Sequence, residues 1–110
     1  MNNRKGILLL MFDLPSTTAE DRKQYTRFRK ELRSQGYWQM QKSCYLKLLR
    51  NVSASDQNIA ELKKSLPKGG NISVLPLSLN EFKAMKCLLG EPFDVPLYTD
   101  DIYCLGETAD

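Results

Sequence analysis

Apolar residues along this chain recur with the spacings of strands and helices, and turn-forming residues separate the runs. Residues 6–13 form a nearly continuous apolar run, which is typical of a strand with both faces covered. We expect a helix from a cap at Thr17 or Thr18 to Gln35, with Gly36 just beyond its end. Its single apolar stripe consists of Tyr25, Phe28 and Leu32.

The middle of the chain predicts further strands and a second helix. Residues 37–49 alternate apolar and polar positions, which is typical either of one long bent strand or of two short strands. Ser53 or Ser55 is expected to cap the following helix, which Pro67 ends. The residues of this helix expected to face inward are Ile59, Leu62 and Leu66.

The last third of the chain predicts a strand, a short helix and a terminal strand. Residues 72–79 form the first of these, and Pro76 within it indicates a sheet edge or a bend. Asn80 is expected to cap a short helix, and residues 102–105 predict a last strand after a proline-containing linker. The apolar residues expected on the short helix are Phe82, Met85, Leu88 and Leu89.

The order of these elements is typical of an α+β fold, a ferredoxin-like βαββαβ sandwich with an extra C-terminal strand. Two helices cover only one face of a four-stranded sheet, yet the first strand is apolar on both faces. A second copy of the sheet would cover the bare face, so the pattern favours a homodimer formed through sheet faces. The alternative is a monomer in which residues 81–89 form the cover. Residues 102–105 would join the edge of their own sheet or swap onto the partner's.

An uneven distribution of charge adds to this picture. Residues 1–90, the predicted core domain, hold all sixteen lysines and arginines and seven acids, a net charge of +9. Residues 91–110, an acidic C-terminal segment, hold six acids and no base, a net charge of −6. A basic body favours an anionic partner, most commonly nucleic acid. The acidic segment favours docking on a basic protein surface, and the alternative is a solubilising tail.

The residue types present exclude several classes of chemistry. The chain has no histidine, which excludes histidine general bases and Ser–His or Cys–His nucleophiles. The chain has an odd number of cysteines and no CxxC pair, which favours buried free thiols over disulfides or a zinc site. The cysteines are Cys44, Cys87 and Cys104. The longest apolar run, residues 7–12, is too short for a membrane span and no signal cleavage site follows it, so we expect a cytoplasmic protein.

Asp13 is the first candidate for chemistry. It ends the first predicted strand and precedes a proline turn, so its carboxylate is expected at the rim of the sheet. Magnesium binds one or two carboxylates together with phosphates and water, and one Asp13 from each of two chains near a two-fold axis would supply such a pair. The alternative is that Asp13 begins an Asx turn before Pro15 and the helix.

The first helix is the second candidate. Six of the sixteen bases form two adjacent rows away from its apolar stripe, with only three acids among them, whereas a solvated helix normally alternates signs. Such a band is typical of a surface that contacts a phosphate backbone, and the alternative is a merely soluble face. The six bases are Arg22, Lys23, Arg27, Arg29, Lys30 and Arg33.

Taken together, these residues resemble the CRISPR-associated protein two family, and in particular its members from type II systems. The resemblance spans roughly residues 5 to 106 and rests on the order and spacing of several short stretches. These are Ile7-Leu-Leu-Leu-Met-Phe-Asp13-Leu-Pro, the basic helix, Gly36-Tyr-Trp, Gln41-Lys-Ser43-Cys-Tyr45, Lys68-Gly-Gly-Asn71-Ile-Ser-Val and Ile102-Tyr-Cys-Leu-Gly106. Cys44 stands where the family usually has valine.

The resemblance implies a ferredoxin-like homodimer whose sheets face each other and whose C-terminal strand completes the interface. Members of the family sit between integrase dimers and help to hold a DNA protospacer for insertion into the CRISPR array. Many are described as magnesium-dependent endoribonucleases or deoxyribonucleases. Their metal ligand is the aspartate that ends the first strand, which is Asp13 in this chain.

Two main hypotheses follow. The first is a non-catalytic subunit of spacer acquisition, whose dimer binds duplex DNA through the six bases and bridges integrase subunits. The second is a magnesium-dependent endonuclease of RNA or DNA that uses Asp13. A toxin-like ribonuclease of the same fold, unconnected with CRISPR, is a third. The residues expected to contact the integrase are Asp100, Asp101, Ile102, Tyr103 and Leu105.

Overall fold

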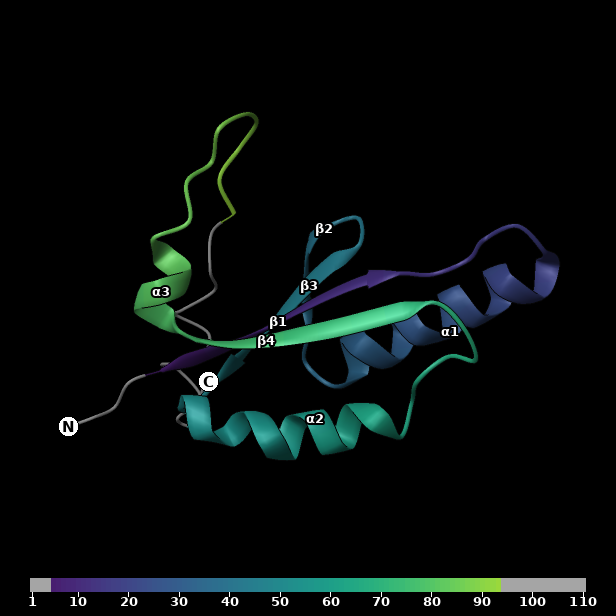
Figure 1. Cartoon of the computed structure of the whole chain (residues 1–110), viewed down its shortest axis with the longest axis horizontal. Helices are drawn as coiled ribbons and strands as arrows, with labels where there is room; N and C mark the ends of the chain where they lie inside the picture. Colours follow the sequence, from purple (N-terminus) through teal and green to yellow (C-terminus); the bar gives the residue numbers. More distant parts are fainter. Residues whose placement is uncertain (1–4, 94–110) are drawn as a thin grey trace.

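The computed structural model describes residues 5–93, which form a four-stranded antiparallel sheet with three helices (Figure 1). The strands are β1 (Gly6–Asp13), β2 (Trp38–Gln41), β3 (Cys44–Leu49) and β4 (Asn71–Ser78). The helices are α1 (Ala19–Ser34), α2 (Ser55–Lys63) and α3 (Leu79–Lys83), and a 3-10 turn, η1 (Val52–Ala54), precedes α2. The sheet order β2-β3-β1-β4 confirms the predicted α+β class and is compatible with a ferredoxin-like fold.

Local interactions set the ends of α1 as the sequence predicted. The Thr18 hydroxyl accepts a hydrogen bond from the Asp21 N–H at 3.0 Å, and the Asp21 carboxylate accepts one from the Thr18 N–H at 3.2 Å. This capping box starts the helix. Gly36 follows its C-terminal end with a φ of 93°. Of the two alternatives for residues 37–49, the observed one is two short strands, β2 and β3, paired antiparallel.

The predicted start of the second helix is wrong, because neither Ser53 nor Ser55 caps it. The Asn51 side chain instead accepts a hydrogen bond from the Ala54 N–H at 3.1 Å and begins η1. The chain continues from this turn into α2, which has no side-chain cap of its own. Leu66 was expected to face inward but is 44% exposed, because α2 ends before that residue.

The predicted start and length of the third helix are also wrong. Ser78, rather than Asn80, forms the capping box with Glu81, so α3 begins at Leu79. The helix has only five residues, of which Phe82 is buried. Three apolar residues expected on it lie beyond its end and are exposed: Met85, Leu88 and Leu89. The predicted edge position of Pro76 is confirmed, because β4 lies at the edge of the sheet.

One face of the sheet packs on α1 and α2. Phe12 of β1 lies at the centre of this layer, with its ring 5.8 Å from those of Tyr25, Phe28 and Tyr45. The first two contacts are edge-to-face and the third is stacked. The buried residues of this cluster are Leu8, Leu10, Phe12, Phe28, Leu32, Tyr37, Tyr45, Leu49 and Leu62.

The opposite face is covered at one end by α3 (Figure 1), and Phe93 from the segment after α3 also packs there. There Phe82 packs with a buried set formed by Ile7, Leu9 and Leu46. Strand register places three large side chains on the same face that remain partly exposed: Met11 at 40%, Trp38 at 45% and Leu75 at 46%. In the monomer alternative, the third helix has to cover this whole face. Within residues 5–93, α3 covers only part of it. The homodimer stays a prediction, and residues 102–105 lie outside the described residues.

Candidate functional site

Asp13 lies at the end of β1 with an exposed side chain, as expected for a residue at the rim of the sheet. Register pairs it with Asn71, the first residue of β4, so both side chains lie on the partly open face. Within residues 5–93 the carboxylate has no hydrogen-bond or ion-pair partner. The Asx turn is not formed, because the backbone group that it needs belongs to Pro15, which has no N–H.

The environment of Asp13 suits a hard cation with an incomplete protein shell. Magnesium takes oxygen ligands and usually keeps several waters while binding one or two carboxylates and substrate phosphates. The Asp13 carboxylate, free of protein partners among the described residues, and the carboxamide of neighbouring Asn71 offer such oxygens. In the described part of the chain, no three His, Cys, Asp or Glu side chains gather in a metal-binding group. One chain would therefore supply a single carboxylate at this rim.

The proximity of Asn71 to Asp13 was missed in the sequence, where Asn71 stands just before the strand predicted at residues 72–79. The two residues are far apart along the chain and meet through the pairing of β1 with β4. Local patterns carry no information on that register. The family-like stretch from Lys68 to Val74 also marked this segment, but it did not place Asn71 beside Asp13.

The outer face of α1 carries exposed positive charge as predicted, at five of the six positions. None of the six bases forms an ion pair with a carboxylate within residues 5–93. The side chains of Lys30 and Arg33 are exposed and form no hydrogen bond in that range. The exposed members of this set, which we call the α1 basic face, are Arg22, Lys23, Arg27, Lys30 and Arg33.

Two arginines of the α1 basic face also make short-range hydrogen bonds. Arg22 donates from Nη1 to the carbonyl oxygens of Thr17 and Ser16, at 3.0 and 3.4 Å, which ties the β1–α1 loop to the helix. Arg27 donates from Nη2 to Oε1 of Gln24 at 3.0 Å. A guanidinium has five N–H donors, so both side chains keep donors that point to solvent and are available to a phosphate.

Arg29 differs from the other five bases because it folds against the aromatic cluster. Its Nε donates to the Tyr45 hydroxyl at 3.2 Å, and its guanidinium carbon lies 5.8 Å from the centre of the Tyr25 ring. The bond to Tyr45 raises the pKa of Arg29 further. The side chain is half-buried. Arg29 therefore makes structural contacts between α1 and β3, and its predicted contact with a phosphate backbone stays a prediction.

The remaining predicted residues lie partly outside the described chain. Cys44 and Cys87 are free thiols. Burial raises the pKa of Cys44, whereas Cys87 is exposed beyond α3, so the prediction that it is buried is wrong. Cys104 lies outside the described residues, as do the residues predicted to contact the integrase: Asp100, Asp101, Ile102, Tyr103 and Leu105. Within residues 5–93 there is no helix with the length and apolar character needed to cross a bilayer.

Comparison with known proteins gives a consistent result. The model of a family described as CRISPR associated protein Cas2 matches residues 7–85, which include Asp13, α1 and, except for Gly6, all four strands of the sheet. A protein of Streptococcus mutans serotype c (strain NN2025), named CRISPR-associated endoribonuclease Cas2, is 49% identical over 84 residues, 76% of this chain and 78% of the relative.

Two further relatives carry the same name. The protein of Acidovorax ebreus (strain TPSY) is 36% identical over 85 residues, 77% of this chain and 83% of its own length. The protein of Treponema denticola (strain ATCC 35405) is 34% identical over 94 residues, 86% of this chain and 93% of its own length. The similarity therefore extends over most of both chains in each pair.

Proposed function

This chain belongs to the family of CRISPR associated protein Cas2, and we propose that it is a subunit of CRISPR spacer acquisition that dimerises, binds the backbone of duplex DNA and bridges integrase subunits. The observation that supports this proposal best is the α1 basic face, five exposed bases without an ion pair among the described residues. Lysines and arginines that remain uncompensated at a surface gain most from a polyanion, because binding releases its condensed counterions.

The dimensions of α1 suit this role. Its sixteen residues extend over about 24 Å at about 1.5 Å per residue. Successive phosphates of one DNA strand are about 3.4 Å apart along the axis, so α1 is as long as roughly seven base-pair steps, and only the phosphates on the near side of the duplex are within its reach. Contacts of this kind position a duplex without reading its sequence. That suits a protein that must accept protospacers of any sequence.

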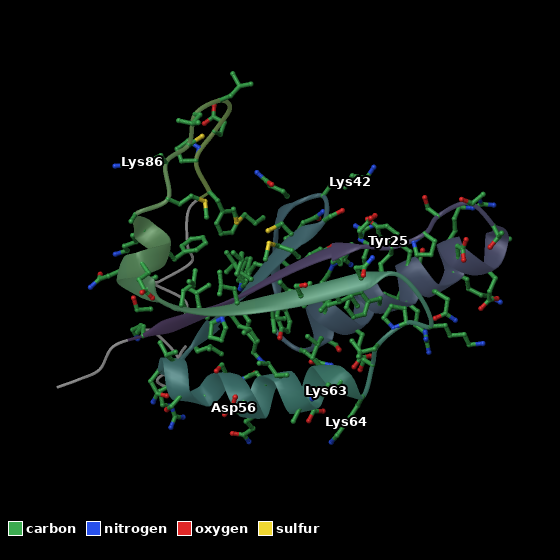
Figure 2. All side chains as sticks on the ribbon, in the orientation of Figure 1. Tyr25, Lys42, Asp56, Lys63, Lys64 and Lys86 are labelled. Atoms are coloured by element: carbon green, nitrogen blue, oxygen red, sulfur yellow. The ribbon has the colours of Figure 1, made fainter. Side chains whose placement is uncertain are left out.

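The DNA-binding proposal is tested by the salt dependence of duplex affinity in matched double variants. Removing Lys30 and Arg33 together should weaken binding and make the slope of log K against log salt less negative by about 1.8, or about 0.9 for each phosphate that is no longer neutralised. The control removes Lys83, the last residue of α3, and Lys86 beyond it, which Figure 2 labels. Both are exposed, and α3 packs on the sheet face opposite α1. Equal effects of the two double variants would contradict a specific role of α1.

The partly open sheet face supports the dimer. A second copy packed on this face would cover Met11, Trp38 and Leu75 and would add a second α1 and a second Asp13 to the assembly. Leu75→Lys should convert the dimer to a monomer in analytical ultracentrifugation. Leu66→Lys is the matched control, because Leu66 is equally exposed at 44% but lies beside α2. A wild-type protein that sediments as a monomer at all concentrations would contradict the proposal.

We assign Asp13 the role of a magnesium ligand in this assembly, with Asn71 beside it as a further oxygen donor. A bound magnesium ion would neutralise charge on a phosphate that approaches the rim of the sheet. The observation that supports this role is the exposed carboxylate without a partner among the described residues. Water and phosphate oxygens would complete the coordination, because a single chain contributes few ligands here.

A second candidate function is that of a metal-dependent endonuclease, and the name endoribonuclease that the relatives carry favours RNA cleavage. Its test compares RNA and DNA cleavage by highly purified wild type and Asp13→Ala in magnesium. Cleavage that depends on Asp13 would favour the nuclease. Equal residual cleavage in both proteins would indicate a contaminant and favour the scaffold.

Integrase binding is assigned to the acidic C-terminal segment because of its net charge of −6. Phe93 packs with the cluster around Phe82, so a truncation that tests this role should retain it and remove only residues 94–110. The truncated protein should keep its affinity for duplex DNA and lose co-purification with the integrase. If the truncated protein still co-purifies with the integrase, the integrase contact lies within residues 1–93 and the proposed role of the acidic segment is wrong.

A further inference from the structure

Gly70 approaches the backbone of Asp13 from the turn that precedes β4. A Cβ atom placed on Gly70 would lie 2.7 Å from the Asp13 carbonyl oxygen and 2.7 Å from Cδ2 of Leu14. It would also lie 3.1 Å from the Leu14 Cα. Cβ atoms essentially never come within 3.0 Å of such atoms, and two of these three contacts are with backbone atoms. A side chain at position 70 would therefore have to displace the chain at Asp13 and Leu14.

The backbone conformation of Gly70 adds a second restriction. Its φ is +97°, in the region that glycine adopts without steric cost and other residues adopt rarely. Gly70 directly precedes Asn71, which forms the last pair of the β1–β4 ladder with Asp13. The turn before Asn71 therefore packs directly against the end of β1 at Asp13, and no side chain fits between the two segments.

The position of the Asp13 carboxylate depends on this backbone contact more than on side-chain partners. Within residues 5–93 no side chain or backbone donor holds the carboxylate by a hydrogen bond. Its location relative to Asn71 is therefore set by the pairing of the two strands and by how closely the turn at Gly70 approaches β1. A cation ligand must keep its oxygens within a few tenths of an ångström of their places.

We propose that Gly70 is a positioning residue for Asp13, one that keeps its carboxylate beside Asn71 at the place where a divalent cation would bridge protein and phosphate. This inference rests on the proposed role of Asp13 as a metal ligand. A methyl group at position 70 would push the Asp13–Leu14 backbone outward and separate the two oxygen donors. The consequence is weaker cation binding, with the α1 basic face left in place.

Two other glycines of the chain provide matched controls. Gly69 has no positive φ, and among the described residues no atom would lie within 4 Å of its Cβ, so Gly69→Ala changes the neighbouring residue without strain or collision. Gly90 has a φ of +89°, and no atom of residues 5–93 would lie within 4 Å of its Cβ, so Gly90→Ala imposes the backbone strain without the contact. Gly70→Asn keeps the contact but eases the strain, because asparagine tolerates positive φ better than alanine does.

The test measures Mn²⁺ affinity of the full-length protein with bound duplex DNA, by electron paramagnetic resonance of the free ion. Gly70→Ala and Gly70→Asn should both weaken Mn²⁺ binding by about tenfold or more, as is typical when groups that orient a ligand are changed. Gly69→Ala and Gly90→Ala should stay within about twofold of wild type. Wild-type affinity in both Gly70 variants would overturn the proposal.

Two further readouts separate this inference from the function on which it rests. Asp13→Asn should lose the Mn²⁺ site. Equal Mn²⁺ affinity in Asp13→Asn and wild type would contradict the role of Asp13 as a metal ligand, and the inference about Gly70 would then fail as well. In metal-free ¹H–¹⁵N spectra, Gly70→Ala should shift the amides of Asp13, Leu14 and Asn71, whereas Gly69→Ala should not shift those of Asp13 and Leu14. Unchanged Asp13 and Leu14 signals in Gly70→Ala would overturn the positioning role even if Asp13 binds the cation. If the Gly70→Ala protein does not fold, the Mn²⁺ affinity of Gly70→Asn decides the test.

Discussion

Replacing Arg29 by alanine separates the structural arginine of α1 from those that we propose contact DNA. In the folded chain Arg29 donates to the hydroxyl of Tyr45, which is 1% exposed, and lies over the ring of Tyr25. The substitution removes both contacts and leaves the Tyr45 hydroxyl without the hydrogen bond that it has in wild type. Its main effect should therefore be on stability, with little effect on the number of phosphates bound.

The magnitude follows from the two contacts. The hydrogen bond contributes about 1 kcal/mol of net stability. The cation–π contact adds about 0.5 kcal/mol at a half-exposed position. The better helix propensity of alanine offsets a few tenths of a kcal/mol of this loss in stability. The free energy of unfolding should fall by about 1 to 1.5 kcal/mol. For a domain of this size, the melting temperature should fall by roughly 4 to 12 °C.

The assay combines thermal denaturation by circular dichroism, at one fixed protein concentration, with duplex binding by fluorescence anisotropy at several salt concentrations. Arg33→Ala is the control, because Arg33 is exposed and has no partner among the described residues. It should melt within about 0.5 kcal/mol of wild type and make the salt slope less negative by about 0.9. An Arg29→Ala protein that melts like wild type and changes the slope as Arg33→Ala does would refute the structural role.

Two further predictions concern buried aromatic residues. Phe82→Ala should lower the free energy of unfolding in urea by about 3 to 4 kcal/mol, because Phe82 is buried against Ile7 and Leu46 where α3 covers the sheet. The control is Met85→Ala, at a residue that is 49% exposed, and it should change the free energy of unfolding little. Tyr37→Phe should raise stability by about 1 kcal/mol at neutral pH, because the Tyr37 hydroxyl is buried and has no hydrogen-bond partner in the part of the chain that the structure describes. Burial also raises the pKa of Tyr37 to about 12, whereas the unfolded chain releases this proton near pH 10. Wild type should therefore lose stability relative to Tyr37→Phe as the pH rises from about 10 to about 12, and parallel pH profiles of unfolding would contradict this.

Neighbouring residues in the sequence determined β1, α1 and the turn after it. The capping box of Thr18 and Asp21 closes within four residues, and Gly36 supplies a positive φ that few other residues tolerate. Pro76 could be placed at a sheet edge because it has no N–H for a second neighbouring strand. The continuous apolar run of β1 also indicated correctly that both faces of this strand are needed for packing.

The starts of α2 and α3 could not be chosen from local pattern alone. Each has several serines and asparagines nearby that cap equally well in isolation. The chain uses Asn51 for η1 before α2 and Ser78 for α3, while Ser53, Ser55 and Asn80 remain unused as caps. The choice depends on which start brings the apolar residues of the helix onto the sheet, and that is a property of the whole fold.

By itself, the sequence determined the class of the fold, the basic outer face of α1 and the place of Asp13 at the end of a strand. Only the tertiary structure decided which groups these residues meet. It turned Arg29 inward onto Tyr45, set Asn71 beside Asp13 and brought Gly70 against the Asp13 carbonyl. The physical reason is that strand register and helix packing are settled by burying two apolar faces at once, through contacts between segments far apart in the chain.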